Sequence, residues 1–164
     1  MNAHTAQLAQ TSTRSQRGVA AVEFALVLFL LMVLVSGTVE FGRTIWYYNS
    51  LTKATRDGAR WMSMVPVDQV AAGVTQAKEL VFAAAAAAGV PDVTRAHVDV
   101  SCLNNGFAPV ACQNGTEPVY VRVAITGYNV VMGGWIALFS STGQTSTRET
   151  ALAPHTTMRY VALN

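Results

Sequence analysis

One long apolar run, residues 19–39, dominates the pattern of hydrophobic and polar positions along this chain. Glu23 is its single charged residue, and the other positions are aliphatic, aromatic or small. A helix rises ~1.5 Å per residue, so a run of this length spans the ~30 Å hydrocarbon core of a bilayer. The pattern predicts a single-pass transmembrane helix over residues 19–42.

The helical pattern continues beyond the membrane run. From Phe41 to Met62, apolar and small positions recur at spacings of four and three, which is one stripe of a helix. The first proline after the run is Pro66. We therefore expect one helix from about residue 19 to about residue 64. Gly58, which weakens a helix by ~1 kcal/mol relative to alanine, marks a place where it could break.

Farther along, the pattern predicts a second helix and then strands. Valines and alanines at helical spacing cover residues 67–88, and Gly89 and Pro91 end that segment. Strict alternation follows over residues 95–102 and again over about 119–128, which predicts two antiparallel strands.

The C-terminal third is less regular. The apolar stretch 130–139 is too short to span a bilayer. It fits a strand continuation, a short helix on the membrane surface or a partner-facing patch, and core packing is the simplest interpretation. Residues 140–148 read as an exposed loop, and residues 155–162 as a third strand. The expected fold is α+β: a long N-terminal transmembrane helix extended into a small periplasmic domain with a second helix and a short antiparallel sheet.

Charge sets the orientation of the membrane helix. Arg14 and Arg17 precede the apolar run, and residues 1–22 contain no acidic residue. Positive charge before a first helix keeps that end in the cytoplasm, so residues 43–164 should form an extracytoplasmic domain. The net charge is only +2, including both leader arginines, which gives no support for nucleic-acid binding.

The chain has two cysteines, Cys102 and Cys112, both in the predicted outer domain. In an oxidising periplasm a close pair favours a disulfide, with two buried free thiols as the alternative. The three histidines, His4, His97 and His155, show no metal-ligand spacing with the cysteines, so we expect no metal and no cofactor.

The residue before the apolar run is unusual for a secretory leader, whose cleavage site follows the run. Here Gly18 stands directly between the basic segment and the run, and Glu23 is the fifth residue after it. This arrangement resembles the leader of type IV pilins. The resemblance implies that a prepilin peptidase cuts between Gly18 and Val19, removes residues 1–18 and leaves the hydrophobic helix on the mature protein.

Three segments make the resemblance narrower: RGVAAVEFAL at 17–26, VEFGR at 39–43 and ATRDGAR at 54–60. Together they resemble the TadE-like family, the pseudopilins of tight-adherence (Flp) pilus systems. The resemblance implies a minor pseudopilin that helps to assemble such a pilus. Its partners would be other pilins or pseudopilins, through the N-terminal helix, and the inner-membrane pilus assembly machinery. It would reside in the bacterial inner membrane or in the pilus.

The family resemblance implies that Glu23 pairs with the N-terminal amine of a neighbouring subunit. A carboxylate in an apolar helix is costly without a cation, and a new N-terminus at Val19 supplies one at nearly the same depth. The alternative is a carboxylate that reaches the lipid headgroups. Glu40, at the other end of the run, needs no more explanation than a helical pair with Arg43.

Enzyme signatures are absent from the sequence: it has no G-x-S-x-G, no phosphate-binding loop of the Walker type and no H-E-x-x-H. We therefore expect no enzymatic activity. An uncleaved, signal-anchored periplasmic binding or scaffold module is the main alternative. A membrane-tethered enzyme would require a cluster of polar groups in a pocket of the folded domain.

Overall fold

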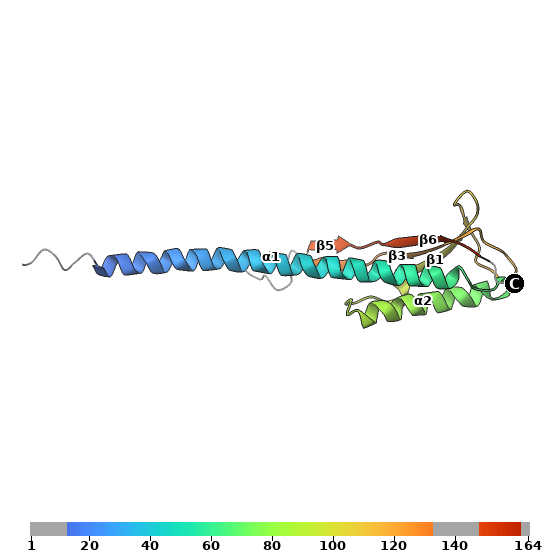
Figure 1. The fold of residues 1–164 in the computed structure, drawn as a ribbon, viewed down its shortest axis with the longest axis horizontal. Coiled ribbons are helices and arrows are strands. Elements are labelled where there is room, and N and C mark those ends of the chain that lie inside the picture. The colour runs from blue at the N-terminus through green and yellow to red at the C-terminus, as the bar shows by residue number, and fades with distance from the viewer. Residues whose placement is uncertain (1–12, 133–147, 162–164) are drawn as a thin grey trace, which may run out of the picture. The chain divides into compact units, whose positions relative to one another are not determined.

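A computed structural model describes residues 13–132 and 148–161 of the chain. It divides into two compact units, residues 1–41 and residues 42–164. The mixed composition of helices and antiparallel strands confirms the expected α+β class. Figure 1 shows the second unit as two helices packed beside a sheet.

The first helix, α1 (Thr13–Met62), is continuous. It begins earlier than the predicted start at about residue 19, because residues 13–18 are also helical. No proline interrupts this stretch, so helical hydrogen bonding can continue from the apolar run into it. The expected weak point at Gly58 is not a break, since the helix passes through it and ends at Met62.

The second helix follows Pro66 as a short 3₁₀ turn, η1 (Val67–Gln69), and then α2 (Val70–Ala87). It returns beside the last turns of α1 (Figure 1). Both Gly18–Met62 and Val67–Ala87 are long and apolar enough to cross a membrane. In α2, however, one face is buried in the domain, with Val70, Ala77 and Val81 fully covered. Within the second unit, α2 is a core helix.

The main sheet has four antiparallel strands in the order β2-β1-β3-β6. Their bounds are β1 (Val98–Leu103), β2 (Pro109–Val110), β3 (Tyr120–Ile125) and β6 (His155–Arg159). A 3₁₀ turn, η2 (Arg95–His97), precedes β1, so the first predicted strand starts three residues later than expected. The register places Val100 opposite Val123, and Val123 opposite Thr156.

One face of this sheet packs on the two helices. Alternate residues of β1 and β3 point inward, and they are buried as the alternation predicted; they are Val98, Val100, Cys102, Val121, Val123 and Ile125. The other face carries Asp99, Arg122 and Thr157, which are exposed or partly exposed. An antiparallel sheet with one buried face and one solvent-exposed face accounts for this period-two pattern.

A separate hairpin follows the sheet. Strands β4 (Asn129–Met132) and β5 (Arg148–Ala151) pair antiparallel, with Val130 opposite Thr150. Gly127, at φ 66°, separates β3 from β4 where the sequence predicted one strand to Tyr128. For the stretch 130–139, the strand interpretation holds through Met132, and its remaining residues lie outside the described part, as does most of the expected loop 140–148.

Candidate functional site

The surface of residues 19–39 of α1 is apolar on every side. Large apolar side chains here are far more exposed than a soluble helix would leave them, for example Val19 at 65%, Phe24 at 67% and Leu31 at 55%. A helix that is hydrophobic all round belongs in lipid or inside a larger assembly. The long apolar helix that the sequence predicted is therefore present, with a surface suited to a membrane anchor.

The three residues of the predicted processing and pairing site lie on this helix within two turns of one another. Gly18 and Val19 are exposed, and Glu23 follows Val19 by four residues, so Val19 and Glu23 share one helix face. The described side chains place no cation in a salt bridge with Glu23.

Gly18 has no packing role in the structure. A Cβ atom built at this position would meet nothing within 4 Å, and the same holds for Gly37 and Gly42. Its backbone is helical and lies outside the left-handed region that favours glycine. Neither sterics nor backbone geometry therefore requires glycine at position 18.

Glu40 is more enclosed than the sequence indicated. It is 8% exposed, and only Thr55 and Ser63 share its class of buried polar side chains among the described residues. The Arg43 guanidinium also lies 5.8 Å from the centre of the Tyr47 ring, at cation–π distance.

The segment 54–60 has one helix face that packs against the domain and another that carries charged residues. Ala54, Thr55, Gly58 and Ala59 are buried, whereas the polar residues between them are exposed. The Thr55 hydroxyl lies 3.0 Å from the Thr52 carbonyl oxygen and 3.2 Å from the Thr156 hydroxyl of β6. These contacts attach the last strand of the sheet to α1, which sequence reasoning did not anticipate.

Gly58 is the residue of this segment where neighbouring elements approach the α1 backbone most closely. A Cβ atom at Gly58 would lie 2.5 Å from Cγ2 of Val81 on α2 and 3.6 Å from Cγ1 of Val123 on β3. Glycine therefore lets α1, α2 and β3 meet at one point. The sequence showed only the intrinsic helix penalty of glycine, because Val81 and Val123 are distant along the chain.

The disulfide between Cys102 and Cys112 is present, as predicted, with the two Cα atoms 5.4 Å apart. Cys102 lies in β1, and Cys112 follows β2 by two residues. The bond thus closes the connection that carries the short edge strand β2. Both cysteines are used in it, and the described residues contain no group of three His, Cys, Asp or Glu side chains that could hold a metal ion.

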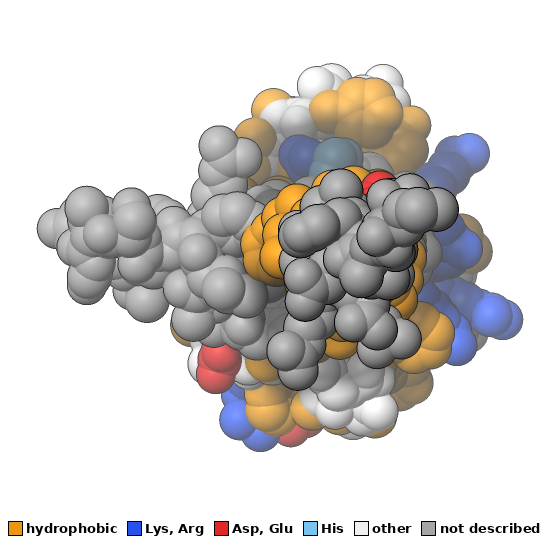
Figure 2. All heavy atoms as spheres, turned by 90° about the vertical axis from the view of Figure 1, so that its left-hand side faces the viewer, with side chains coloured by type: hydrophobic (Ala, Val, Ile, Leu, Met, Phe, Trp, Pro, Cys, Tyr) orange, Lys and Arg blue, Asp and Glu red, His pale blue; other side chains and the backbone are white. Residues whose placement is uncertain are grey.

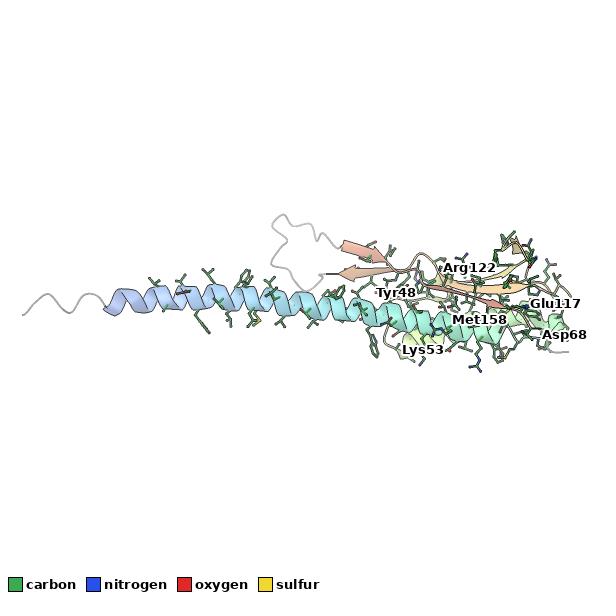
Figure 3. All side chains as sticks on the ribbon, turned by 45° about the horizontal axis from the view of Figure 1, so that its top comes forward. Tyr48, Lys53, Asp68, Glu117, Arg122 and Met158 are labelled. Atoms are coloured by element: carbon green, nitrogen blue, oxygen red, sulfur yellow. A yellow bond between two sulfur atoms is a disulfide. The ribbon has the colours of Figure 1, made fainter. Side chains whose placement is uncertain are left out.

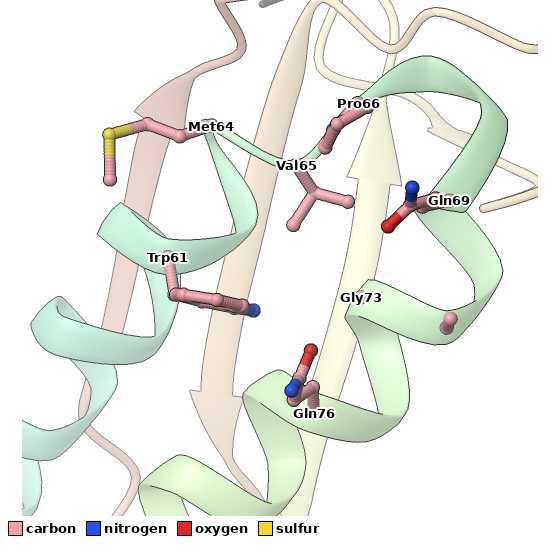
Figure 4. A pocket seen from close by; sticks show the side chains of 8 residues that line it. Trp61, Met64, Val65, Pro66, Gln69, Gly73 and Gln76 are labelled. Carbon is pink, nitrogen blue, oxygen red and sulfur yellow. The ribbon is translucent and has the colours of Figure 1, made fainter.

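A groove of about 400 Å³ lies between the end of α1 and the start of α2. Figure 4 shows its lining, in which the Trp61 indole points toward Gln76 across the space between the helices. Trp61, Met64, Val65, Pro66, Gln69, Ala72, Gly73 and Gln76 line it. None of these is an acid, a base or a nucleophile, so this groove does not provide the polar cluster that an enzyme would need.

Residues 18–60 match the family model described as TadE-like protein, which is the family that the sequence motifs resembled. The match covers about a quarter of the chain and includes Gly18, Glu23 and the segment 54–60. No curated protein and no solved structure gives a significant match.

Proposed function

We propose, from the match of residues 18–60 to the TadE-like family, that this protein is a minor pseudopilin. It would take part in the assembly of a tight-adherence pilus of the Flp type. It enters the inner membrane with its N-terminus in the cytoplasm. A prepilin peptidase removes residues 1–18, residues 19–42 remain as the transmembrane helix, and residues 43–164 form the periplasmic domain.

The observation that carries this proposal is an exposed carboxylate that is the single charge of the apolar run 19–39. Glu23 has no cation beside it among the described side chains, while its neighbours in the run are exposed apolar residues. In a bilayer such a carboxylate costs roughly 2.5–3.5 kcal/mol at the helix centre and less near an end. A partner that brings a cation to it, and apolar surface to the rest of the helix, removes both costs.

Cleavage after Gly18 creates that cation. The new N-terminal amine at Val19 lies one helical turn from Glu23 in the same chain, and so at nearly the same depth as Glu23 of a neighbour. Breaking one half of a buried charge pair is strongly destabilising, so the pair sets the register between neighbouring helices as well as holding them together.

The test is Glu23→Ala in a strain that lacks the native gene. Membrane insertion should be intact or improved, because a costly carboxylate has been removed, and cleavage should be little affected, because Gly18 borders the cut. Pilus assembly should be lost, because the neighbouring amine then lacks its counter-charge. The measurements are the membrane level, the mass of the mature form, and surface pili or adherence.

Two further variants separate charge from shape at this position. Glu23→Gln keeps the size and removes the charge, so it should behave like Glu23→Ala, whereas Glu23→Asp keeps the charge and should retain part of the assembly. Normal piliation with alanine or glutamine at 23 would contradict the pairing role. Glu23 would then be an interfacial residue that reaches the headgroups.

A further inference from the structure

The exposed face of α1 beyond Gly42 carries a row of positive charge. Lys53, Arg56 and Arg60 follow one another at spacings of three and four, which places them on one side of the helix. All three are exposed, on the side opposite the buried residues Leu51, Thr55 and Met62. We call these three residues the basic ridge; it extends over ~10 Å at ~1.5 Å per residue.

The salt bridges of the described residues do not include the ridge. Among the described residues, none of its three cations takes part in a salt bridge, although the domain does pair Arg95 with Glu79, at 2.7 Å between Nη2 and Oε1. The one carboxylate on the same helix face is Asp57, which can offset one of the three charges. Several lysine and arginine side chains lie along the right-hand side of the view in Figure 2, and others lie at its lower left.

The first residue that lines the groove follows the last ridge residue in the sequence. Arg60 precedes Trp61, whose indole lines the groove and is 39% exposed, and Met64 at its rim is 41% exposed. Gly73 allows the groove to have a close-packed floor, because a Cβ there would lie 2.8 Å from Cγ1 of Val65. A volume of about 400 Å³ lies in the range of ligand pockets and accommodates a bulky apolar side chain.

We propose that the basic ridge and the groove together bind an acidic segment of a partner protein, which inserts a bulky apolar side chain into the groove and lays carboxylates along the ridge. Charge complementarity selects the acidic segment, and the exposed tryptophan and methionine select the apolar anchor. This surface lies in the outer domain and does not depend on the pairing of Glu23.

The charge pattern favours a different protein over a second copy of this chain. Acidic residues are scattered singly through the sequence, and Asp92 and Asp99 are the nearest two to each other. A single segment of this chain therefore cannot present three carboxylates at the spacing of the three ridge cations. Asp68 and Glu117, which are labelled near each other at one end of the domain in Figure 3, come from separate segments and do not form such a run.

The test uses the full-length protein in nanodiscs of phosphatidylcholine and a fluorescent helical peptide as the probe. The peptide carries one phenylalanine near an end and three glutamates spaced to match Lys53, Arg56 and Arg60. Its binding, measured by fluorescence anisotropy, should weaken as salt is raised, because exposed charges are screened. Peptides with glutamine for glutamate, or alanine for phenylalanine, should bind less well.

Matched variants locate the site. Replacing all three ridge cations (Lys53→Gln, Arg56→Gln and Arg60→Gln) should weaken binding about tenfold, since exposed charge pairs contribute ~0.2–1 kcal/mol each. Arg159→Gln, an exposed cation on the opposite face of the sheet, should leave binding unchanged. Ala72→Phe, which fills the groove from an exposed position on α2, should also weaken binding, whereas Ala71→Phe, exposed but outside the groove, should not.

Three results would overturn the proposal. Equal losses for Arg159→Gln and the ridge variant would mean non-specific attraction between charges. Unchanged binding in the ridge and Ala72→Phe variants would mean that the peptide binds elsewhere or not at all. Concentration-dependent self-association that disappears in these same variants would make a second copy the occupant. As a control, thermal unfolding of each variant is measured to check that the fold is retained.

Discussion

At the scale of single residues, glycines of α1 differ in what their surroundings require. Gly58 is enclosed by Val81 and Val123, so the absence of a side chain is a packing requirement there. Gly42, on the same helix, has open space where a Cβ would be, and there glycine only weakens the helix. The contrast identifies Gly58 as the point through which the second unit is assembled on α1.

Gly58→Ala should therefore destabilise the domain even though alanine is the better helix former. The gain of ~1 kcal/mol in helix propensity is outweighed by the strain of overpacking against a stiff valine, typically about 1–3 kcal/mol. Thermal unfolding of the detergent-solubilised protein should show a lower midpoint for Gly58→Ala and an equal or higher one for Gly42→Ala. Adding Val81→Ala to Gly58→Ala should cost less than the two separate losses together. A midpoint for Gly58→Ala at or above the wild type would refute the contact.

Tyr160 links the end of the sheet to the turn after α1. Its hydroxyl donates a hydrogen bond to the Val65 carbonyl oxygen, and the side chain is buried, at 5% exposed. Burial, followed by the negative charge of Glu117, raises the pKa of the Tyr160 phenol above its usual value. The folded state therefore holds this proton more tightly than the unfolded chain does.

The sign of the effect follows from linkage. Stability from Tyr160 is complete below the unfolded pKa of about 10 and is lost as the pH rises through the higher folded pKa. Melting temperatures should fall more steeply above pH ~10 in the wild type than in Tyr160→Phe. Tyr128, whose pKa burial also raises, should leave part of the fall in that variant. Identical pH profiles for the two proteins would show that Tyr160 does not contribute.

At the scale of elements, the two edges of the main sheet are secured differently. On one side β6 is attached to α1 through the contact between Thr156 and Thr55 and through the Val161 N–H, which donates to the Ser63 carbonyl oxygen. On the other side β2 has only two residues paired with β1. The disulfide between Cys102 and Cys112 compensates for the shortness of this strand.

Removal of the disulfide should affect β2 first. By the chain-entropy estimate, a loop this small contributes roughly 2–3 kcal/mol, so Cys102→Ala with Cys112→Ala should lower the unfolding midpoint accordingly. Hydrogen exchange should speed up in β2 and its flanking loop more than in β3. Reductant should lower the midpoint of the wild type and leave the double variant unchanged. Titration of two free thiols in the unfolded, non-reduced protein would disprove the bond in the native protein.

At the scale of the whole molecule, α1 contributes to both units. Its first part has an apolar surface suited to a membrane anchor, and its last turns pack against the sheet of the second unit. Helical structure also continues through Gly18 into residues 13–17. A peptidase that cuts after Gly18 would therefore meet a helical segment and would have to unwind it locally.

Processing can be tested by mass. The protein extracted from membranes should lack residues 1–18, and Gly18→Leu should leave it at full length. Open space at Gly18 lets leucine fit without a clash, so a loss of cleavage would report recognition by the peptidase and not misfolding. Gly37→Leu, at an equally open position in the same helix, should mature normally. Normal maturation of Gly18→Leu would place the cut elsewhere, and a full-length wild type would favour the uncleaved anchor.

The sequence by itself determined the features that depend on local periodicity. The apolar run, the long helix, the second helix and the inward faces of β1 and β3 all follow from spacings within one segment, because each segment buries one face or one stripe. The cysteine pair and the TadE-like motifs were likewise readable, since they consist of residue types at fixed positions.

Tertiary structure alone decided the features that join distant segments. The reason for Gly58 lies in Val81 and Val123, the partner of Thr55 is Thr156, and the groove is formed where two helices meet. The split of β3 from β4, and the short strands β2 and β5, also depend on strand pairing more than on local pattern. Such contacts arise only after the chain has folded back on itself, so no window of sequence contains both partners.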